Sequence, residues 1–82
     1  MYDREDNMKR AVLQINEIDC SLCGVVIESV LMRTEGVQSA SVNEKVKRAE
    51  VIFDPKLIDP AKIQAKILSL GYRTTLLGES QA

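Results

Sequence analysis

The chain has 82 residues, of which 45% are hydrophobic and 28% are charged, with a formal net charge of −1. This length allows one small domain, and the near-neutral charge gives no reason to expect binding to nucleic acid or to an anionic membrane surface. No apolar run reaches the length of a membrane span, and the charged N-terminus lacks the hydrophobic stretch of a secretory signal, so we expect a cytoplasmic domain without direct membrane contact.

The first part of the chain changes from strand to helix periodicity. Residues 1–8 are expected to form a flexible tail. Hydrophobic and polar residues then alternate over residues 11–18, which predicts a strand with Leu13 and Ile15 on one face. Over residues 21–34 the spacing changes to three and four, which predicts a helix that ends before a glycine. The predicted buried side of this helix contains Cys23, Ile27, Val30, Leu31 and Thr34.

The second part of the chain predicts two strands joined by a turn, followed by one helix and one last strand. Strands are expected over residues 37–43 and 48–53, joined by a charged turn. Asp59 followed by Pro60 is typical of a helix start, and we expect this helix to end at Gly71. A short strand over residues 72–77 and a flexible tail over residues 78–82 complete the chain. The folded domain is therefore expected over residues 9–77.

The predicted order is β-α-β-β-α-β. This order is typical of the ferredoxin-like α+β sandwich, in which two helices cover one face of a four-stranded antiparallel sheet. The residues expected to pack together across the two layers are Ile27, Leu31, Ile63, Ile67, Leu13, Val42 and Val51. The charged side chains Glu17, Glu28, Lys62 and Lys66 are expected to be solvated.

Cys20 and Cys23 are the only cysteines, and the chain has no histidine. A separation of three residues at a strand–helix junction lets both sulfurs reach one metal ion, and the start of the helix stabilises their thiolate forms. Two thiolates cannot complete the four-ligand cage of a structural zinc site. Any bound metal ion is therefore expected to be held openly and to be exchangeable. Without histidine a Ser-His-Asp triad is impossible, which argues against a hydrolase.

The cysteine pair lies within a longer pattern that resembles the heavy-metal-associated domain family. The motif is Ile18-Asp19-Cys20-Ser21-Leu22-Cys23, followed by Ile27-Glu28, Leu31, Gly36-Val37, Val42-Asn43, Val51, Phe53-Asp54-Pro55 and Gly71-Tyr72. This family includes copper chaperones and the N-terminal domains of heavy-metal-transporting P-type ATPases. The resemblance implies a non-enzymatic, monomeric metal-binding domain. Its implied partner is another Cys-x-x-Cys domain or a transport ATPase.

The chain departs from the common family pattern just before the cysteines. Glu17-Ile18 replaces the usual Gly-Met, and Ile18 can still serve as the apolar residue beneath the loop. Asp19 stands where copper carriers more often have threonine or serine. In the family, an acidic residue there resembles the zinc, cadmium and lead transporters, in which it can act as a third ligand. Asp19 is therefore a candidate metal ligand, with helix capping as the alternative, and it moves the expected cargo slightly towards Zn(II) or Cd(II) over Cu(I).

The resemblance also points to Tyr72, which in bacterial family members packs near the metal site; ordinary packing at the core boundary is the alternative. A different functional class remains open, because thiol–disulfide oxidoreductases also carry Cys-x-x-Cys at a helix start. The intervening Ser21-Leu22 contains no proline, and the two prolines, Pro55 and Pro60, suit a turn and a helix start. The sequence does not distinguish a free-standing chaperone from the cytosolic domain of a larger transporter.

Overall fold

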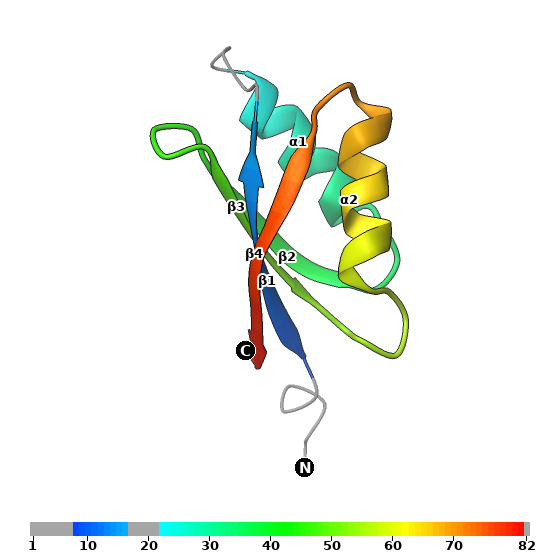
Figure 1. Ribbon diagram of the computed structural model, residues 1–82. Helices are drawn as coiled ribbons and strands as arrows, with labels where there is room; N and C mark the ends of the chain where they lie inside the picture. The colour runs from blue at the N-terminus through cyan, green and yellow to red at the C-terminus, as the bar shows by residue number, and fades with distance from the viewer. Residues whose placement is uncertain (1–7, 17–21, 82) are drawn as a thin grey trace.

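The computed structural model describes residues 8–16 and 22–81 of the chain. The elements follow one another as β1 (Lys9–Ile15), α1 (Cys23–Met32), β2 (Val37–Asn43), β3 (Arg48–Phe53), α2 (Pro60–Ser69) and β4 (Thr74–Gln81). The strands form one sheet in the order β2-β3-β1-β4, and every neighbouring pair is antiparallel. Both helices cover the same face of this sheet (Figure 1). The predicted ferredoxin-like sandwich is therefore confirmed.

The hydrophobic core lies between the sheet and the two helices. The fully buried large side chains are Leu13, Ile15, Ile27, Leu31, Val51, Phe53, Ile63 and Ile67. Each such side chain contributes roughly 1.5–3 kcal/mol by leaving water. Val42 differs from the prediction, because it is only half-buried and packs at the margin of the core. The reason is its position on β2, which is an edge strand.

The helix ends agree with the sequence predictions at α2 and differ from them at α1. Asp59 caps α2 as predicted, because its Oδ1 accepts a hydrogen bond from the backbone N–H of Lys62 over 2.9 Å. Gly71 follows α2 with a φ of +100°, a left-handed conformation that glycine adopts without strain. The helix predicted to extend to Thr34 instead ends at Met32, and the Thr34 hydroxyl donates to the Val30 carbonyl.

No described helix is both long and apolar enough to cross a membrane.

The first and last strands differ from the predicted bounds. β1 begins at Lys9 and ends at Ile15, whereas residues 17–18 of the predicted strand lie outside the described residues. β4 does not stop at residue 77: residues 78–81, predicted to be a tail, pair with the first half of β1. The sequence gives no sign of this pairing, because residues 78–81 show no apolar alternation. In the structure the side chains of these residues are all exposed. The paired ends of β1 and β4 extend beyond the helices (Figure 1).

Candidate metal centre

Cys23 is the first residue of α1, and its side chain is 8% exposed. It belongs to the cluster of buried residues that fills the core, so its position is fixed by packing. In the structure Cys23 is part of a disulfide bond. A disulfide is the oxidised form of cysteine, whereas the reduced thiolate is the form that binds metals. The other predicted site residues before the helix, Ile18, Asp19 and Cys20, lie outside the described residues.

Tyr72 contacts the candidate site directly. Its hydroxyl donates a hydrogen bond to Sγ of Cys23 over 2.8 Å, although the two residues are 49 positions apart in the sequence. Tyr72 lies between α2 and β4, and its half-buried ring packs against the core. This hydrogen bond connects the segment that follows α2 with the first residue of α1. The role beside a bound metal ion that the resemblance implies for Tyr72 stays a prediction.

The start of α1 is suited to a negatively charged sulfur. The N-cap residue is Leu22, whose side chain makes no capping hydrogen bond, and the first helical turn contains no acidic residue. The first N–H groups of a helix have no partner within the helix, and with the helix dipole they favour an anion. A thiolate at Cys23 therefore lies where the backbone stabilises negative charge. Asp19, the capping residue that the sequence suggested, lies outside the described residues.

Two neighbouring turns hold the end of β1, which closely precedes the undescribed residues 17–21. The backbone N–H of Ile15 donates to the carbonyl of Lys47 over 2.8 Å, and that of Asn16 donates to the carbonyl of Arg73 over 2.9 Å. Lys47 is in the turn between β2 and β3, and Arg73 directly precedes β4. Sequence reasoning did not identify either residue, because each acts through its backbone. The sequence could have indicated Lys47 only through the antiparallel strand order, which places the start of β3 beside the end of β1.

Glu28 is not simply solvated, as the sequence predicted. It is half-buried on α1, and its Oε2 accepts a hydrogen bond from the backbone N–H of Val42 over 2.7 Å. Because β2 is an edge strand, this N–H receives its partner from a helix side chain instead of a neighbouring strand. The prediction for Glu28 was wrong because the helical pattern shows which face a residue occupies, whereas the position of β2 depends on the tertiary fold. Lys62 and Lys66 are exposed on α2, as predicted.

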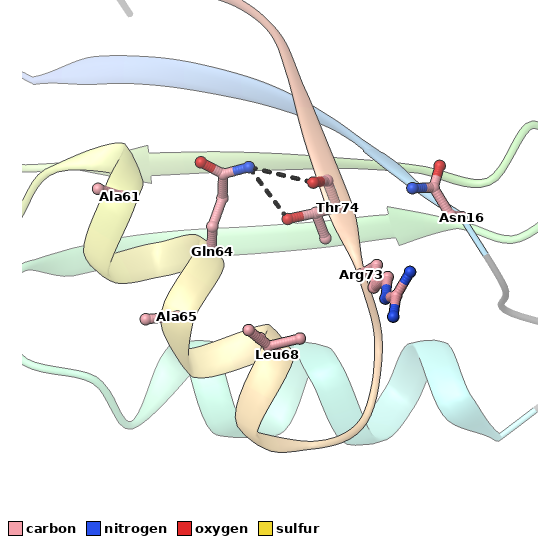
Figure 2. A pocket seen from close by; sticks show the side chains of 7 residues that line it. All are labelled: Asn16, Ala61, Gln64, Ala65, Leu68, Arg73 and Thr74. Carbon is pink, nitrogen blue, oxygen red and sulfur yellow. Dashed lines mark hydrogen bonds between the residues drawn. The ribbon is translucent and has the colours of Figure 1, made fainter.

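A groove lies between α2 and the start of β4 (Figure 2). The Gln64 side chain crosses from α2 to Thr74, where its Nε2 donates to the carbonyl over 3.3 Å and to Oγ1 over 3.2 Å. The described residues that line the groove are Asn16, Ala61, Gln64, Ala65, Leu68, Arg73 and Thr74. They include no thiolate or carboxylate, so the groove does not offer the ligands of a thiophilic metal.

No group of three or more histidine, cysteine, aspartate or glutamate side chains is arranged to hold a metal ion within residues 8–16 and 22–81. Cys23 is therefore the one predicted ligand that these residues contain. A complete ligand set would need residues from the undescribed segments or a donor from outside the chain.

A family model, described as the heavy-metal-associated domain, matches residues 12–73. One relative is a zinc-transporting ATPase of Synechocystis sp. (strain ATCC 27184 / PCC 6803 / Kazusa), which is 38% identical over 65 residues, covering 79% of this chain and 9% of the relative. Another is a copper-exporting P-type ATPase of Bacillus subtilis (strain 168), 39% identical over 64 residues, covering 78% of this chain and 8% of the relative. The chain thus spans less than a tenth of either protein.

Solved structures show the same fold. The Cu(I)-loaded N-terminal domain of a potential copper-translocating P-type ATPase from Bacillus subtilis is 29% identical, with a TM-score of 0.84 over 92% of this chain and 94% of that one. A copper-binding domain of HMA7, a P-type ATPase, is 31% identical, with a TM-score of 0.83 over 87% of this chain and 96% of that one. The family model, the relatives and the matching fold lead to one conclusion. The chain belongs to the heavy-metal-associated domain family.

Proposed function

We propose that the chain binds a heavy-metal ion through Cys20 and Cys23 and passes it to a partner by ligand exchange. The observation that carries this proposal is the position of Cys23, nearly buried at the positive end of α1 and contacted by the Tyr72 hydroxyl. The family match over residues 12–73 includes both cysteines and supports the same reading. Thiolates are the preferred ligands of soft metals such as Cu(I) and also bind zinc.

Ligand exchange follows from a coordination shell with too few ligands. A partner thiolate bonds to the ion first, and one of the two sulfur–metal bonds of this chain then breaks. A second partner thiolate repeats the exchange, so the ion never enters water. The partner thiols lose protons as they bind, and the released cysteines regain protons. The metal keeps its oxidation state throughout, so no oxidant or reductant is needed.

Cu(I) is the first candidate cargo. The names of most of the relatives and structural neighbours refer to copper, and they do not favour the Zn(II) or Cd(II) that Asp19 led us to expect. Zn(II) and Cd(II) remain the second candidate, because one relative is a zinc transporter and Asp19 offers a carboxylate oxygen. Zinc prefers four ligands, which two sulfurs, Asp19 and water or a partner thiolate would supply.

The partner in this proposal is another Cys-x-x-Cys domain or a heavy-metal-transporting P-type ATPase. The chain acts either as a metallochaperone or as the N-terminal metal-binding domain of such an ATPase, as the names of its relatives and neighbours suggest. In both settings it works as a monomer on the cytoplasmic side and catalyses no reaction itself.

Titration of the reduced chain with Cu(I), Zn(II) and Cd(II), each in a separate anaerobic experiment, tests the proposal. We expect a one-to-one complex with at least one metal, and its loss when Cys20→Ser and Cys23→Ser are combined. Ser21→Ala is the matched control within the same loop and should keep binding. If the reduced wild-type chain forms no one-to-one complex with any of these ions, the proposal is wrong.

A thiol–disulfide oxidoreductase is the second candidate function. The disulfide form of Cys23 favours it, because such enzymes pass through that state. Against it, Ser21-Leu22 between the cysteines contains no proline, and Pro55 and Pro60 lie in the turn after β3 and at the start of α2. An insulin-reduction assay separates the two functions: we expect no turnover above that of the double cysteine variant, and robust turnover would reverse the ranking.

A further inference from the structure

We infer that the surface formed by α2 and the start of β4 is a docking site for an acidic segment of a partner protein, one that carries an apolar side chain such as leucine. The inference is independent of the proposed metal binding. It rests on a groove, on an exposed apolar stripe and on the distribution of charge over residues 60–78, all of which the structure describes.

An apolar stripe runs along the exposed side of α2. Ala61, Ala65 and Leu68 are spaced by four and three residues, so they lie on one side of the helix. All three side chains are exposed, and that of Leu68 is 57% exposed. This stripe is separate from the buried residues Ile63 and Ile67, which hold α2 against the core. The helix therefore presents a second apolar side that the described residues do not bury.

The stripe forms one wall of the groove shown in Figure 2, which has a volume of about 510 Å³. The two walls are connected by the hydrogen bonds from Nε2 of Gln64 to Thr74. The backbone hydrogen bond from Asn16 to Arg73 holds the far wall against the end of β1. A second hollow of about 380 Å³ adjoins the groove, because Ala65 lines both. The walls thus offer an anchored hollow that an apolar side chain of a partner can enter.

Basic side chains lie on both sides of the apolar stripe. Lys62 and Lys66 line the second hollow, and Arg73 lines the groove from the opposite wall (Figure 2). Residues 60–78 contain these three basic residues and no acidic one, whereas the rest of the chain has 8 basic and 12 acidic residues. Asp59 borders the surface, and its Oδ1 accepts a hydrogen bond from the first turn of α2. The surface is therefore positive on a chain whose net charge is negative.

This combination favours an acidic protein segment over other anions. Complementary charge steers an acidic segment to the surface, and burial of an apolar side chain against Leu68 adds contact energy that charge alone does not supply. Nucleic acid is disfavoured, because the described residues that line the two hollows include no aromatic side chain on which a base could stack. An anionic membrane is disfavoured, because such binding uses clusters of about 4–8 lysines or arginines.

The test uses the reduced, metal-free chain and a synthetic peptide in which one leucine is flanked on both sides by aspartate and glutamate. We expect the peptide to shift the amide signals of Ala61, Ala65 and Thr74 in NMR spectra of the isotope-labelled chain. Raising the salt concentration to about 1 M should weaken binding, because screening is then nearly complete. A control peptide with asparagine and glutamine in place of the acids should bind roughly 10-fold more weakly.

One pair of variants tests the charges. Combining Lys62→Gln, Lys66→Gln and Arg73→Gln removes the three cations of the surface and should weaken peptide binding roughly 10-fold. The matched control removes three exposed cations outside this surface and should change the affinity less than about twofold, since it alters only the net charge. It combines Lys45→Gln, Arg48→Gln and Lys56→Gln.

A second pair of variants tests the apolar contact. Leu68→Ala shortens the side chain that borders the groove and should weaken peptide binding roughly 3-fold. Leu57→Ala is the matched control, because Leu57 is also 57% exposed but lies between β3 and α2, outside both hollows. It should bind the peptide as the wild type does. The NMR spectra of the variants also show that each is folded.

Four outcomes overturn the inference. The first is no change in the named amide signals at millimolar peptide, and the second is equal weakening in the two triple variants, which would show that only net charge matters. The third is binding of single-stranded DNA or anionic vesicles to the same residues as tightly as the peptide. The fourth is the same signal changes when the chain alone is concentrated, which would assign the surface to a second copy. Metal binding is measured separately, so failure of the proposed function leaves these results unaffected.

Discussion

The hydroxyl of Tyr72 donates a hydrogen bond to Sγ of Cys23 over 2.8 Å and so joins the segment before β4 to the first residue of α1. Tyr72 is half-buried and packs against the core, so its ring is held in place independently of this bond. A firmly positioned donor at the sulfur restricts the orientation of the Cys23 side chain. The sulfur that we propose as a metal ligand is thereby held from two directions, by the backbone of α1 and by the segment before β4.

Replacing Tyr72 by phenylalanine keeps the ring and removes the hydrogen bond. We expect the reduced, metal-free protein to lose about 0.5–1.5 kcal/mol of unfolding free energy, the usual contribution of one such bond. Urea denaturation measures the change. Tyr2→Phe, in the segment that the sequence predicts to be a tail, is the control and should leave the midpoint unchanged. An equal loss in both variants would contradict the role of the bond.

Replacing Glu28 by alanine removes the acceptor for the Val42 N–H on the edge strand. We expect a loss of about 1 kcal/mol in unfolding free energy and faster hydrogen exchange at the Val42 amide. Glu28→Gln retains a side-chain oxygen and should restore most of the protection. The exposed Glu35→Ala serves as the control, and identical Val42 exchange in all variants would show that the contact does not protect the strand.

Replacing Ile27 by alanine leaves a cavity in the core, because this side chain is fully buried between α1 and the sheet. The expected cost is about 2–5 kcal/mol, a large share of the roughly 5–15 kcal/mol that stabilises a typical domain. Thermal melts of the metal-free protein measure it. On the same helix Val25 is 55% exposed, so Val25→Ala should change stability little. An unchanged melting point in Ile27→Ala would contradict the core assignment.

Replacing Asp19 by alanine tests whether this carboxylate is a metal ligand. If it is, affinity for Zn(II) should fall more than affinity for Cu(I), because two sulfurs satisfy Cu(I) whereas zinc needs further ligands. Competition between the two metals in the wild type and the variant measures the difference. Asp6→Ala, outside the predicted domain, controls for the loss of one charge. Equal weakening of both metals would leave helix capping as the better explanation.

Local patterns in the sequence were enough to predict the element order and much of the core. Alternation identified the strand residues Leu13 and Val51, and spacing by three and four identified the helix residues Ile27 and Ile63. These predictions succeeded because the side-chain direction in a strand or helix repeats with a fixed period. Residues 78–81 were missed because they pair only through backbone groups, which leave no trace in side-chain polarity.

The sequence by itself determined that a small domain without histidine carries two cysteines three positions apart, and it predicted a helix beginning near them. Only the tertiary structure decided what surrounds Cys23: the hydroxyl of Tyr72 arrives from 49 residues away, and the Glu44 carboxylate packs against Gly24. The physical reason is that spacing along a chain fixes which face a side chain occupies, whereas its neighbours depend on how the sheet and helices pack. The sequence therefore identified Cys23 as a candidate ligand, but it did not identify the side chains that surround the start of α1.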